Sequence, residues 1–371
     1  MSSLAGITML TALPAKDWNY EAAAHLLNRA AFGGTPEEIE QCHAEGAEAS
    51  VDRLLNPPRQ PVRVSDRAWS EPRDATEMRQ QLRSVKGHPQ EQTAKRKELR
   101  KEQQSELQDL RTWWLTRMLD SGAPLVEKMS LFWHGHFATS AQKVKTAFPM
   151  WQQNVLFREH ALGHFPALLQ AVSRDPAMMG YLDLQQSKKD RPNESWAREV
   201  MELFNLGIGN YAEQDVKESA RAFTGYRINQ RHESFRYAVH QHDPTPKTFI
   251  GHTGNFSGDD ILRLIVAEPA CPRFIGRKLW RFFVEDEPSP EAVKNVAELL
   301  RRHDFELKPA LHEVFLSADF YSDRVRRTQI KGPVQFLVQS CKLLGTSLPP
   351  VQATDGALRS MGQMLSSRRQ T

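Results

Sequence analysis

Apolar residues recur every three or four positions along most of the chain, which is the spacing of amphipathic helices. The first such stretch starts at Trp18 and ends at Phe32-Gly33-Gly34. A second begins at Thr35-Pro36-Glu37-Glu38, where a hydroxyl, a proline and a carboxylate fit a helix N-terminus. The same pattern predicts helices at about 124–134, 147–161, 166–173, 193–206, 213–223, 258–267, 271–283, 289–303, 308–317 and 332–344. The fold class expected is therefore mainly α, a multi-helical globular bundle.

A surface excursion and a charged helix are expected at 56–120. Five prolines and few periodic apolar residues between 56 and 90 indicate a long irregular segment. Helix-forming residues then run from Glu91 to Asp120, with Trp113 and Trp114 near the end. The lysines and arginines of the first half stand three or four positions from glutamates, which favours a solvated, self-paired face over nucleic-acid binding. The two tryptophans are expected to anchor the second half in the core.

One region breaks the helical rhythm. Phe235, Tyr237 and Val239 alternate with polar residues, and a second short apolar run, 247–250, follows the turn-rich segment 242–246. This alternation predicts a small β-hairpin insertion at about 234–252. The remaining pattern is continuous, so residues 18–363 are expected to form a single large helical domain.

Composition narrows the classes of protein without naming one. Forty-nine basic residues stand against 45 acidic residues, a balance that predicts no nucleic-acid partner. The three cysteines include no C-x-x-C pair, which excludes a disulfide framework or a cysteine zinc site and favours a reducing compartment. The first residues lack the basic and apolar regions of a secretion signal, and no run of about 18 apolar residues is present. A cytoplasmic protein without membrane association is expected.

The first candidate for chemistry is the pair His134 and His136. Their side chains point the same way only if the chain leaves the helix at Gly135 and becomes extended. Neutral imidazoles so placed can ligate a divalent transition metal. The alternative is structural, because the helix dipole favours a histidine near a helix C-terminus without any metal.

The second candidate is the helix that carries Glu194, Arg198, Glu199 and Glu202. At helical spacing Glu194, Arg198 and Glu202 share one face opposite an apolar stripe, with Glu199 at the border. An excess of carboxylates demands a cation or a proton if that face is buried. The alternative is a surface ladder of ion pairs.

A third polar cluster, with Asp243 and Lys247, lies in a turn-rich segment where side chains can be displayed. Asp243 can instead form an Asx turn before Pro244. Several known chemistries lack their motifs, since G-x-S-x-G, H-E-x-x-H and G-x-x-x-x-G-K-[ST] are all missing. Gly207 and Gly209 belong to a G-x-G-x-x-A run that follows a helix, so they indicate a helix stop and no dinucleotide site.

Six segments in order resemble the signature of one bacterial family: HLLNRAAFG, KMSLFWHGHF, MGYLDL, RPNESWAREVMELFNLGIGNYAEQDVKESARAFTGYR, HDPTPKTFIG and RFIGRKLWRFFV. The family is catalogued as domain of unknown function 1800, and the resemblance covers about Trp18 to Gln363. It implies a bacterial, largely helical domain without an assigned activity. It also implies a possible protein partner, from a neighbouring uncharacterised family similar to the alkaline phosphatase and sulfatase fold.

Two features depart from that family's pattern. Residues 364–371 form an atypical tail that is expected to be truncated, with incomplete packing of any site built partly from it. Ala212 stands where a threonine or serine would cap the helix that begins at Glu213, and loss of such a cap costs about 1 kcal/mol.

These observations support two hypotheses of different classes. The first is a metal- or cofactor-dependent enzyme with a site between helices, in which His134, His136, Glu199 and Glu202 hold a divalent transition metal. Its further residues are Arg198 and Asp183, which orient the carboxylates, together with Asp243 and Lys247. If the site is shared, the histidines should lie within about 8 Å of the two carboxylates. The second hypothesis is a non-catalytic interaction or assembly module whose polar groups form buried structural networks.

Overall fold

A computed structural model describes residues 10–58, 67–72, 80–81, 83–229 and 231–366, and helices make up most of its regular structure. The first part of the chain contains η1 (Ala15–Asp17), α1 (Tyr20–Ala30), α2 (Pro36–Glu45), α3 (Ala47–Leu55), η2 (Ala68–Ser70) and α5 (Pro89–Asp120). The middle part contains α6 (Pro124–His136), α7 (Ala141–Val144), α8 (Ala147–Glu159), α9 (Phe165–Ser173), α10 (Pro176–Tyr181), η3 (Leu184–Gln186), α11 (Glu194–Glu202) and α12 (Glu213–Ala222). The last part contains η4 (Val239–Gln241), α13 (Gly258–Ala267), α14 (Ala270–Phe283), α15 (Pro290–Arg302), α16 (Leu307–Phe315), α17 (Pro333–Leu343) and α18 (Val351–Ser360). The mainly α class is confirmed.

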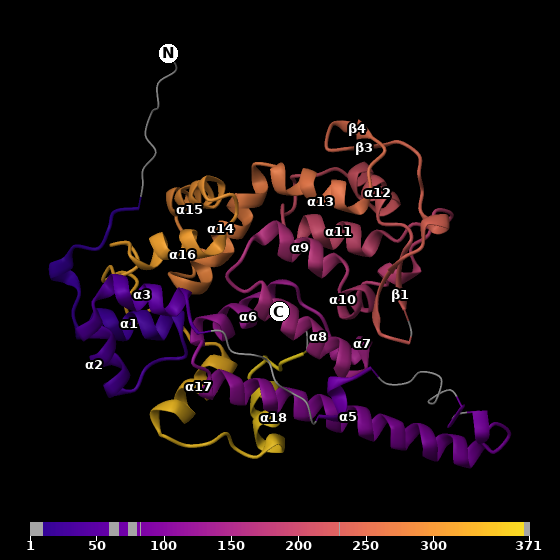
Figure 1. Cartoon of the computed structure of the whole chain (residues 1–371), viewed down its shortest axis with the longest axis horizontal. Helices are drawn as coiled ribbons and strands as arrows, with labels where there is room; N and C mark the ends of the chain where they lie inside the picture. The colour runs from indigo at the N-terminus through magenta and orange to yellow at the C-terminus, as the bar shows by residue number, and fades with distance from the viewer. Residues whose placement is uncertain (1–9, 59–66, 73–79, 82, 230, 367–371) are drawn as a thin grey trace.

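The helices pack around two apolar cores. The larger core is built on α6, α9, α11 and α14 and holds Trp133, Trp196 and Trp280, each at most 2% exposed. The smaller core lies where the second half of α5 meets α8, α17 and α18, around Trp113 and Trp114. Figure 1 places α6 and α8 in the middle of the molecule, between the group formed by α9, α11 and α13 and the group formed by α5, α17 and α18. Any site next to α6 is therefore bounded by both cores.

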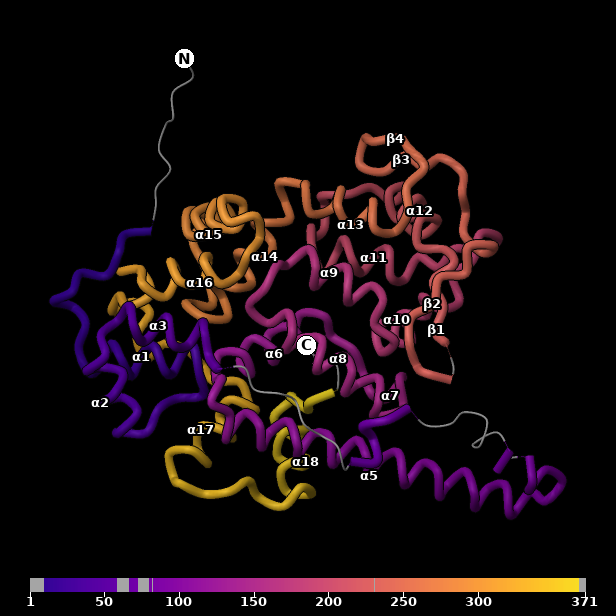
Figure 2. Tube along the Cα trace, viewed as in Figure 1, coloured from indigo at the N-terminus to yellow at the C-terminus, as the bar shows by residue number. Residues whose placement is uncertain are grey.

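Helix α5 behaves as its sequence predicts. Its first half is mainly exposed, and it projects away from the rest of the molecule in Figure 2. Its second half buries Trp113, Trp114 and Met118. Helices α6 and α8, which pack next to α5, are joined by a buried ion pair. Arg158 of α8 donates two hydrogen bonds, of 2.9 and 2.6 Å, to the carboxylate of Glu127 in α6. Arg117 of α5 adds a third contact to that carboxylate at 3.3 Å, so three helices converge on one buried charge.

The predicted β insertion is present, but its strands pair differently from the expectation. Strand β1 (Tyr226–Asn229) pairs with β2 (Ser234–Tyr237), and β3 (Lys247–Phe249) pairs with β4 (His252–Gly254), both antiparallel. The expected pairing of the run around 235–239 with 247–250 was wrong. Neighbouring segments joined by short loops close more easily, and the two residues between β3 and β4, Ile250 and Gly251, both have positive φ. That is the backbone of a tight hairpin turn.

Some helix ends and some expected segments differ from the prediction or fall outside the described residues. Helix α11 ends at Glu202, four residues before the expected 206, and the next residue, Leu203, is 37% exposed. The missing hydroxyl at Ala212 is partly replaced, since the Asp215 carboxylate accepts a hydrogen bond from the Ala212 N–H at 2.8 Å. Much of the expected surface excursion and residues 367–371 of the atypical tail lie outside the described residues. No helix in the described part combines the length and the apolar character needed to cross a membrane.

Candidate functional site

Helix α6 carries both candidate histidines and continues through them. The expected helix exit at Gly135 was wrong, because the helix runs to His136 and the Phe137 N–H still donates to the Trp133 carbonyl at 2.8 Å. Two positions along an α-helix differ by about 200° around its axis. The two imidazoles consequently lie against different parts of the structure.

His134 lies between α5 and the end of the described chain. Its ring meets the Trp114 ring edge-on, with centroids 5.1 Å apart, and its Nε2 accepts a hydrogen bond from the backbone N–H of Ser366 at 3.1 Å. Burial lowers the pKa of His134 to about 4. The imidazole is therefore neutral at physiological pH, and its Nε2 lone pair is already used.

His136 lies on the other side, against α14 and the segment after α11. Its Nδ1 is 3.2 Å from Nζ of Lys278, and its Nε2 is buried without a hydrogen-bond partner among the described residues. Burial and, after it, the charge of Lys278 hold the pKa of His136 well below its usual range, against the opposing effect of the Phe204 carbonyl. A buried polar atom without a partner is costly, so a water, a ligand or a catalytic role is needed to account for it.

Lys278 is fixed by three contacts. Besides His136, its Nζ donates to the Leu203 carbonyl at 2.8 Å and lies 4.5 Å from the centroid of the Phe274 ring. Burial, followed by the nearby charge of Arg281, lowers the pKa of Lys278 to about 8. A lysine of this kind loses its proton close to neutral pH, which an ordinary surface lysine does not do.

These groups surround a cavity of about 350 Å³ between α6 and α14. Its wall includes both histidines and residues of the segments around Gln329 and from Gln363 to Leu365. Among the described residues, the charged side chains of the wall are those of Lys278, Arg281 and Asp286. The cavity thus joins residues that are more than 140 positions apart in the sequence.

The carboxylate helix α11 does not join this cavity. Arg198 makes a two-pronged ion pair with Glu213 of α12, at 2.9 and 2.7 Å, and a longer contact of 3.5 Å with Glu194. The Glu202 carboxylate instead accepts a hydrogen bond of 2.7 Å from the Tyr211 hydroxyl. The alternative for this face was a surface ladder of ion pairs, and the contacts of Arg198 are surface ion pairs of that type. The main partner of Arg198 is Glu213, however, and not Glu202.

The predicted metal site lacks a preformed ligand cluster. Among the described residues, no three of His134, His136, Glu199 and Glu202 bring their ligand atoms within 4.8 Å of one another. A set that does so is Glu48 and Asp52 of α3 with His312 of α16. It lies at the surface, where its contacts of 3.1 and 3.5 Å form an ordinary ion-pair cluster. The shared metal site stays a prediction.

Replacing Glu202 with glutamine tests its role directly. Burial and the neighbouring Glu202 carboxylate raise the pKa of Tyr211 to about 12, so in Glu202→Gln this pKa should fall, because the negative charge that opposes phenolate formation is gone. Unfolding free energy should change by less than about 1 kcal/mol, as expected of a partly exposed group. An ultraviolet titration of the tyrosines measures the pKa, with Glu194→Gln as the matched control. Loss of bound transition metal on the same substitution would instead support the metal site.

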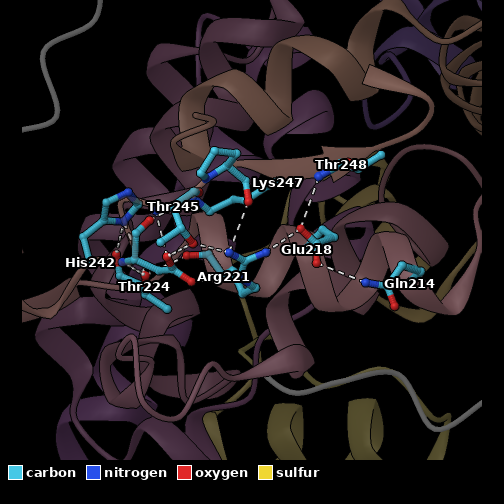
Figure 3. A network of polar contacts seen from close by, with 10 residues as sticks. Gln214, Glu218, Arg221, Thr224, His242, Thr245, Lys247 and Thr248 are labelled. Atoms are coloured by element: carbon cyan, nitrogen blue, oxygen red, sulfur yellow. Dashed lines mark hydrogen bonds and ion pairs between the residues drawn. The ribbon is translucent and has the colours of Figure 1, made fainter. Parts of the chain in front are cut away.

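Asp243 and Lys247 belong to a polar network beside the β3–β4 hairpin, in which Arg221 lies between Glu218 and Thr245 (Figure 3). The Asp243 carboxylate accepts from Arg221 Nε at 2.8 Å and from the Thr245 N–H at 2.9 Å, which is the Asx turn expected as the alternative. Burial acts to raise the pKa of Asp243, but the hydrogen bonds from Arg221 and Thr245 outweigh it and hold this pKa far below its usual range. Lys247 is 1% exposed and donates to the carbonyls of Asp243 and Thr245 at 2.8 and 2.9 Å. These hydrogen bonds fix the conformation of the segment that contains Asp243 and Lys247, which is a structural role.

Asp183 lies in another part of the molecule. Its carboxylate forms an ion pair of 2.6 Å with Lys143, and both side chains line a separate cleft beside α10. None of the residues of that cleft lines the cavity between α6 and α14. Asp183 therefore lines a different cleft from the cavity that His134 and His136 line.

Sequence reasoning missed Lys278 and Arg281, which supply most of the charge of the α6–α14 cavity. They occur in the segment RFIGRKLWRFFV, where four basic residues alternate with apolar ones on an amphipathic helix. Basic residues on such a helix normally face solvent, and nothing local distinguishes Lys278 from Arg277, which is exposed. Only the packing of α14 near α6 makes the difference.

Comparison with known proteins gives a family and no activity. None of the curated proteins matches the chain, and none of the solved structures does. One family model matches residues 25–370, nearly the whole length, and its description is "Protein of unknown function (DUF1800)". The chain therefore belongs to the DUF1800 family.

Proposed function

We propose that the α6–α14 cavity is the active site of an enzyme that transfers a proton to or from a small anionic substrate. The observation that carries this proposal is the contact of 3.2 Å between His136 Nδ1 and Lys278 Nζ at the wall of the cavity. A general acid or base works best when its pKa lies near the operating pH. Lys278, with a pKa of about 8, meets that condition.

The charge of the cavity supports an anionic substrate. Lys278 and Arg281 contribute two positive charges at its wall, and Asp286 contributes one negative charge. Arg281 makes no ion pair with the described residues, so its guanidinium is available to a carboxylate or phosphate group. A volume of about 350 Å³ is at the small end of ligand pockets. A small acid or phosphate monoester therefore suits the cavity better than a cation.

Each residue has a separate role in this proposal. Protonated Lys278 donates a hydrogen bond to His136 Nδ1, so the neutral imidazole carries its own proton on Nε2. Lys278 is the group that gives up or takes the proton, and Arg281 holds the negative end of the substrate. His136 is a positioning residue, because its ring and the Leu203 carbonyl fix the direction of the amine.

Amine labelling at different pH values tests the assignment of Lys278. The protein is treated with trinitrobenzenesulfonate between about pH 6 and pH 11, and modification of each lysine is measured by mass spectrometry. Lys278 should react with a midpoint near its pKa of about 8, whereas exposed Lys97 serves as the reference for an ordinary lysine. A midpoint for Lys278 equal to that of Lys97 would remove the proposed proton-transfer group.

The same labelling tests the class of substrate. Malonate, phosphate and glucose 6-phosphate should each be compared with glycerol for protection of Lys278 at pH 8. We expect at least a threefold slower reaction with one of the anions, and loss of that protection in Arg281→Gln, because the guanidinium holds the ligand. Protection by glycerol alone would contradict an anionic substrate.

The other functional expectations remain proposals. A transition metal bound by the histidines and glutamates is opposed near His136 by the charge of Lys278, and metal analysis of the untagged protein tests it. The role of a non-catalytic assembly module is favoured if no ligand protects Lys278. Three buried free cysteines support the cytoplasmic location. Association with a protein of the alkaline phosphatase and sulfatase fold stays a prediction, which co-purification tests.

A further inference from the structure

A second hollow with a polar wall lies beside α10 and shares no lining residue with the α6–α14 cavity. It is a cleft of about 880 Å³ bounded by α7, α10, η3 and β1. We propose that this cleft binds an uncharged, polyhydroxylated ligand, and that a short oligosaccharide is its natural occupant. The proposal is independent of the function assigned to the α6–α14 cavity.

The charges at the rim of the cleft cancel. Lys143 and Lys145 stand against Asp183 and Glu233, and Lys143 is already paired with Asp183 at 2.6 Å. An ionic ligand would gain little net attraction there and would have to compete with that pair. A neutral ligand meets no such penalty.

The same rim supplies hydrogen-bonding groups of both kinds. The lysine amines donate and the carboxylates accept, while the side-chain amides of Gln142 and Gln185 do both. A hydroxyl group also donates and accepts, so a ligand rich in hydroxyls can satisfy either kind of group. An apolar ligand would leave these groups unpaired and is disfavoured.

The lining of the cleft also includes apolar groups. Pro149, Pro176 and Ile228 line it beside the ring of Tyr181, over which Lys143 Nζ lies 5.9 Å from the centroid. Tyrosine offers a flat apolar surface together with a polar hydroxyl. A sugar ring has the matching character, with a C–H face that packs on apolar side chains such as Pro149, Pro176 and Ile228 and hydroxyls at its edge.

The backbone around the cleft is held in unusual conformations. Lys145, Asp183 and Glu233 all have positive φ, of 71°, 57° and 43°. The left-handed region costs roughly 1–2 kcal/mol for such residues, aspartate being the most tolerant. Strain of this kind gathers at ligand sites, where a side chain must be aimed. Here it is found at three residues of a single cleft.

Isothermal titration calorimetry on the full chain tests the proposal. The probes are maltotetraose, cellotetraose, xylotetraose and chitotetraose, with tetragalacturonate as the charged comparison and a blocked tetra-alanine as the peptide comparison. At least one neutral tetrasaccharide should bind, and its Kd should rise at least tenfold in Tyr181→Ala and in Asp183→Asn. Asn tolerates the left-handed backbone, so Asp183→Asn removes only the charge. Tyr20→Ala, which removes a tyrosine that is 38% exposed elsewhere, should bind as the unchanged protein does.

Several results would overturn the proposal. One is no binding of any neutral tetrasaccharide. Another is tighter binding of tetragalacturonate or of the peptide, which would assign the cleft to an anion or to a polypeptide. A third is saccharide binding that neither Tyr181→Ala nor Asp183→Asn weakens, although both variants melt within a few degrees of the unchanged protein. If Tyr181→Ala does not fold, Gln185→Ala, which alters the rim alone, takes its place.

Discussion

Replacing Glu127 with glutamine should lower the free energy of unfolding by about 3–5 kcal/mol, since it leaves a buried arginine without its counter-ion. Glu127 is 1% exposed, and both of its carboxylate oxygens accept from Arg158, whose side chain is 4% exposed. The Arg158 guanidinium also lies 4.9 Å from the centroid of the Trp113 ring. Loss of the carboxylate therefore affects α5, α6 and α8 together. Urea unfolding followed by tryptophan fluorescence measures the change in the free energy of unfolding.

Two further variants separate the buried charge from a general effect of the substitution. Glu213→Gln removes the exposed partner of Arg198 and should change the free energy of unfolding by less than about 1 kcal/mol. Adding Arg158→Met to Glu127→Gln should recover much of the loss, because the uncompensated charge is then gone. Equal effects of Glu127→Gln and Glu213→Gln would mean that water reaches the Glu127 site.

Helix positions were accessible from the sequence because they depend on local patterns. The periodic apolar residues, the capping residues and the prolines at helix starts act within one or two turns. The capping box at Thr35 and Glu38 is present, and the helices that begin at Ser257 and Ser289 have those residues as N-caps. The charged first half of α5 was also predictable, since its ion pairs lie within one helical turn.

The candidate site was not predictable, because it depends on packing between distant elements. His136 was singled out, but its partner Lys278 is 142 positions away, and no local pattern connects the two. The helix end near Gly135 was misplaced for a related reason. Glycine is a weak helix stop, and burial of Trp133 and Phe137 on either side keeps this glycine inside the helix. That single difference places the two imidazoles on different sides of α6, although both line the α6–α14 cavity.

The polar clusters illustrate how charge patterns alone mislead. Glu194, Arg198 and Glu202 fall on one helical face, yet Arg198 prefers Glu213 of the next helix and Glu202 prefers Tyr211. Asp243 and Lys247 are close in sequence and in space, but both side chains are already used in hydrogen bonds to the backbone. The Asp243 carboxylate accepts from the Thr245 N–H, and the Lys247 amine donates to the Asp243 carbonyl. A cluster of titratable residues is a better candidate for a functional site when a buried group in it lacks a hydrogen-bond partner among the described residues, as Nε2 of His136 does.

Lys128 should make the stability of the protein depend steeply on pH. It is fully buried in α6, where its Nζ donates to the Ala31 carbonyl at 3.1 Å and lies 5.3 Å from the Phe32 ring centroid. Burial, followed by the charges of Arg29 and Lys331, holds the pKa of Lys128 well below its ordinary value. Because folding lowers this pKa, the unfolded chain binds the proton more tightly than the folded chain does, so stability increases as the pH rises toward the unfolded pKa.

Lys128→Met removes this dependence and provides the measurement. Between about pH 8 and pH 10 the unchanged protein should gain up to about 1.4 kcal/mol per pH unit relative to the variant. The variant also loses the hydrogen bond to the Ala31 carbonyl, which costs about 1–3 kcal/mol, but that loss is the same at every pH and leaves the slope unaffected. Lys97→Met, at an exposed position of α5, should give a curve parallel to that of the unchanged protein. If the curve for Lys128→Met is parallel as well, Lys128 keeps its proton in the folded state, and an acidic group or water must lie beside it.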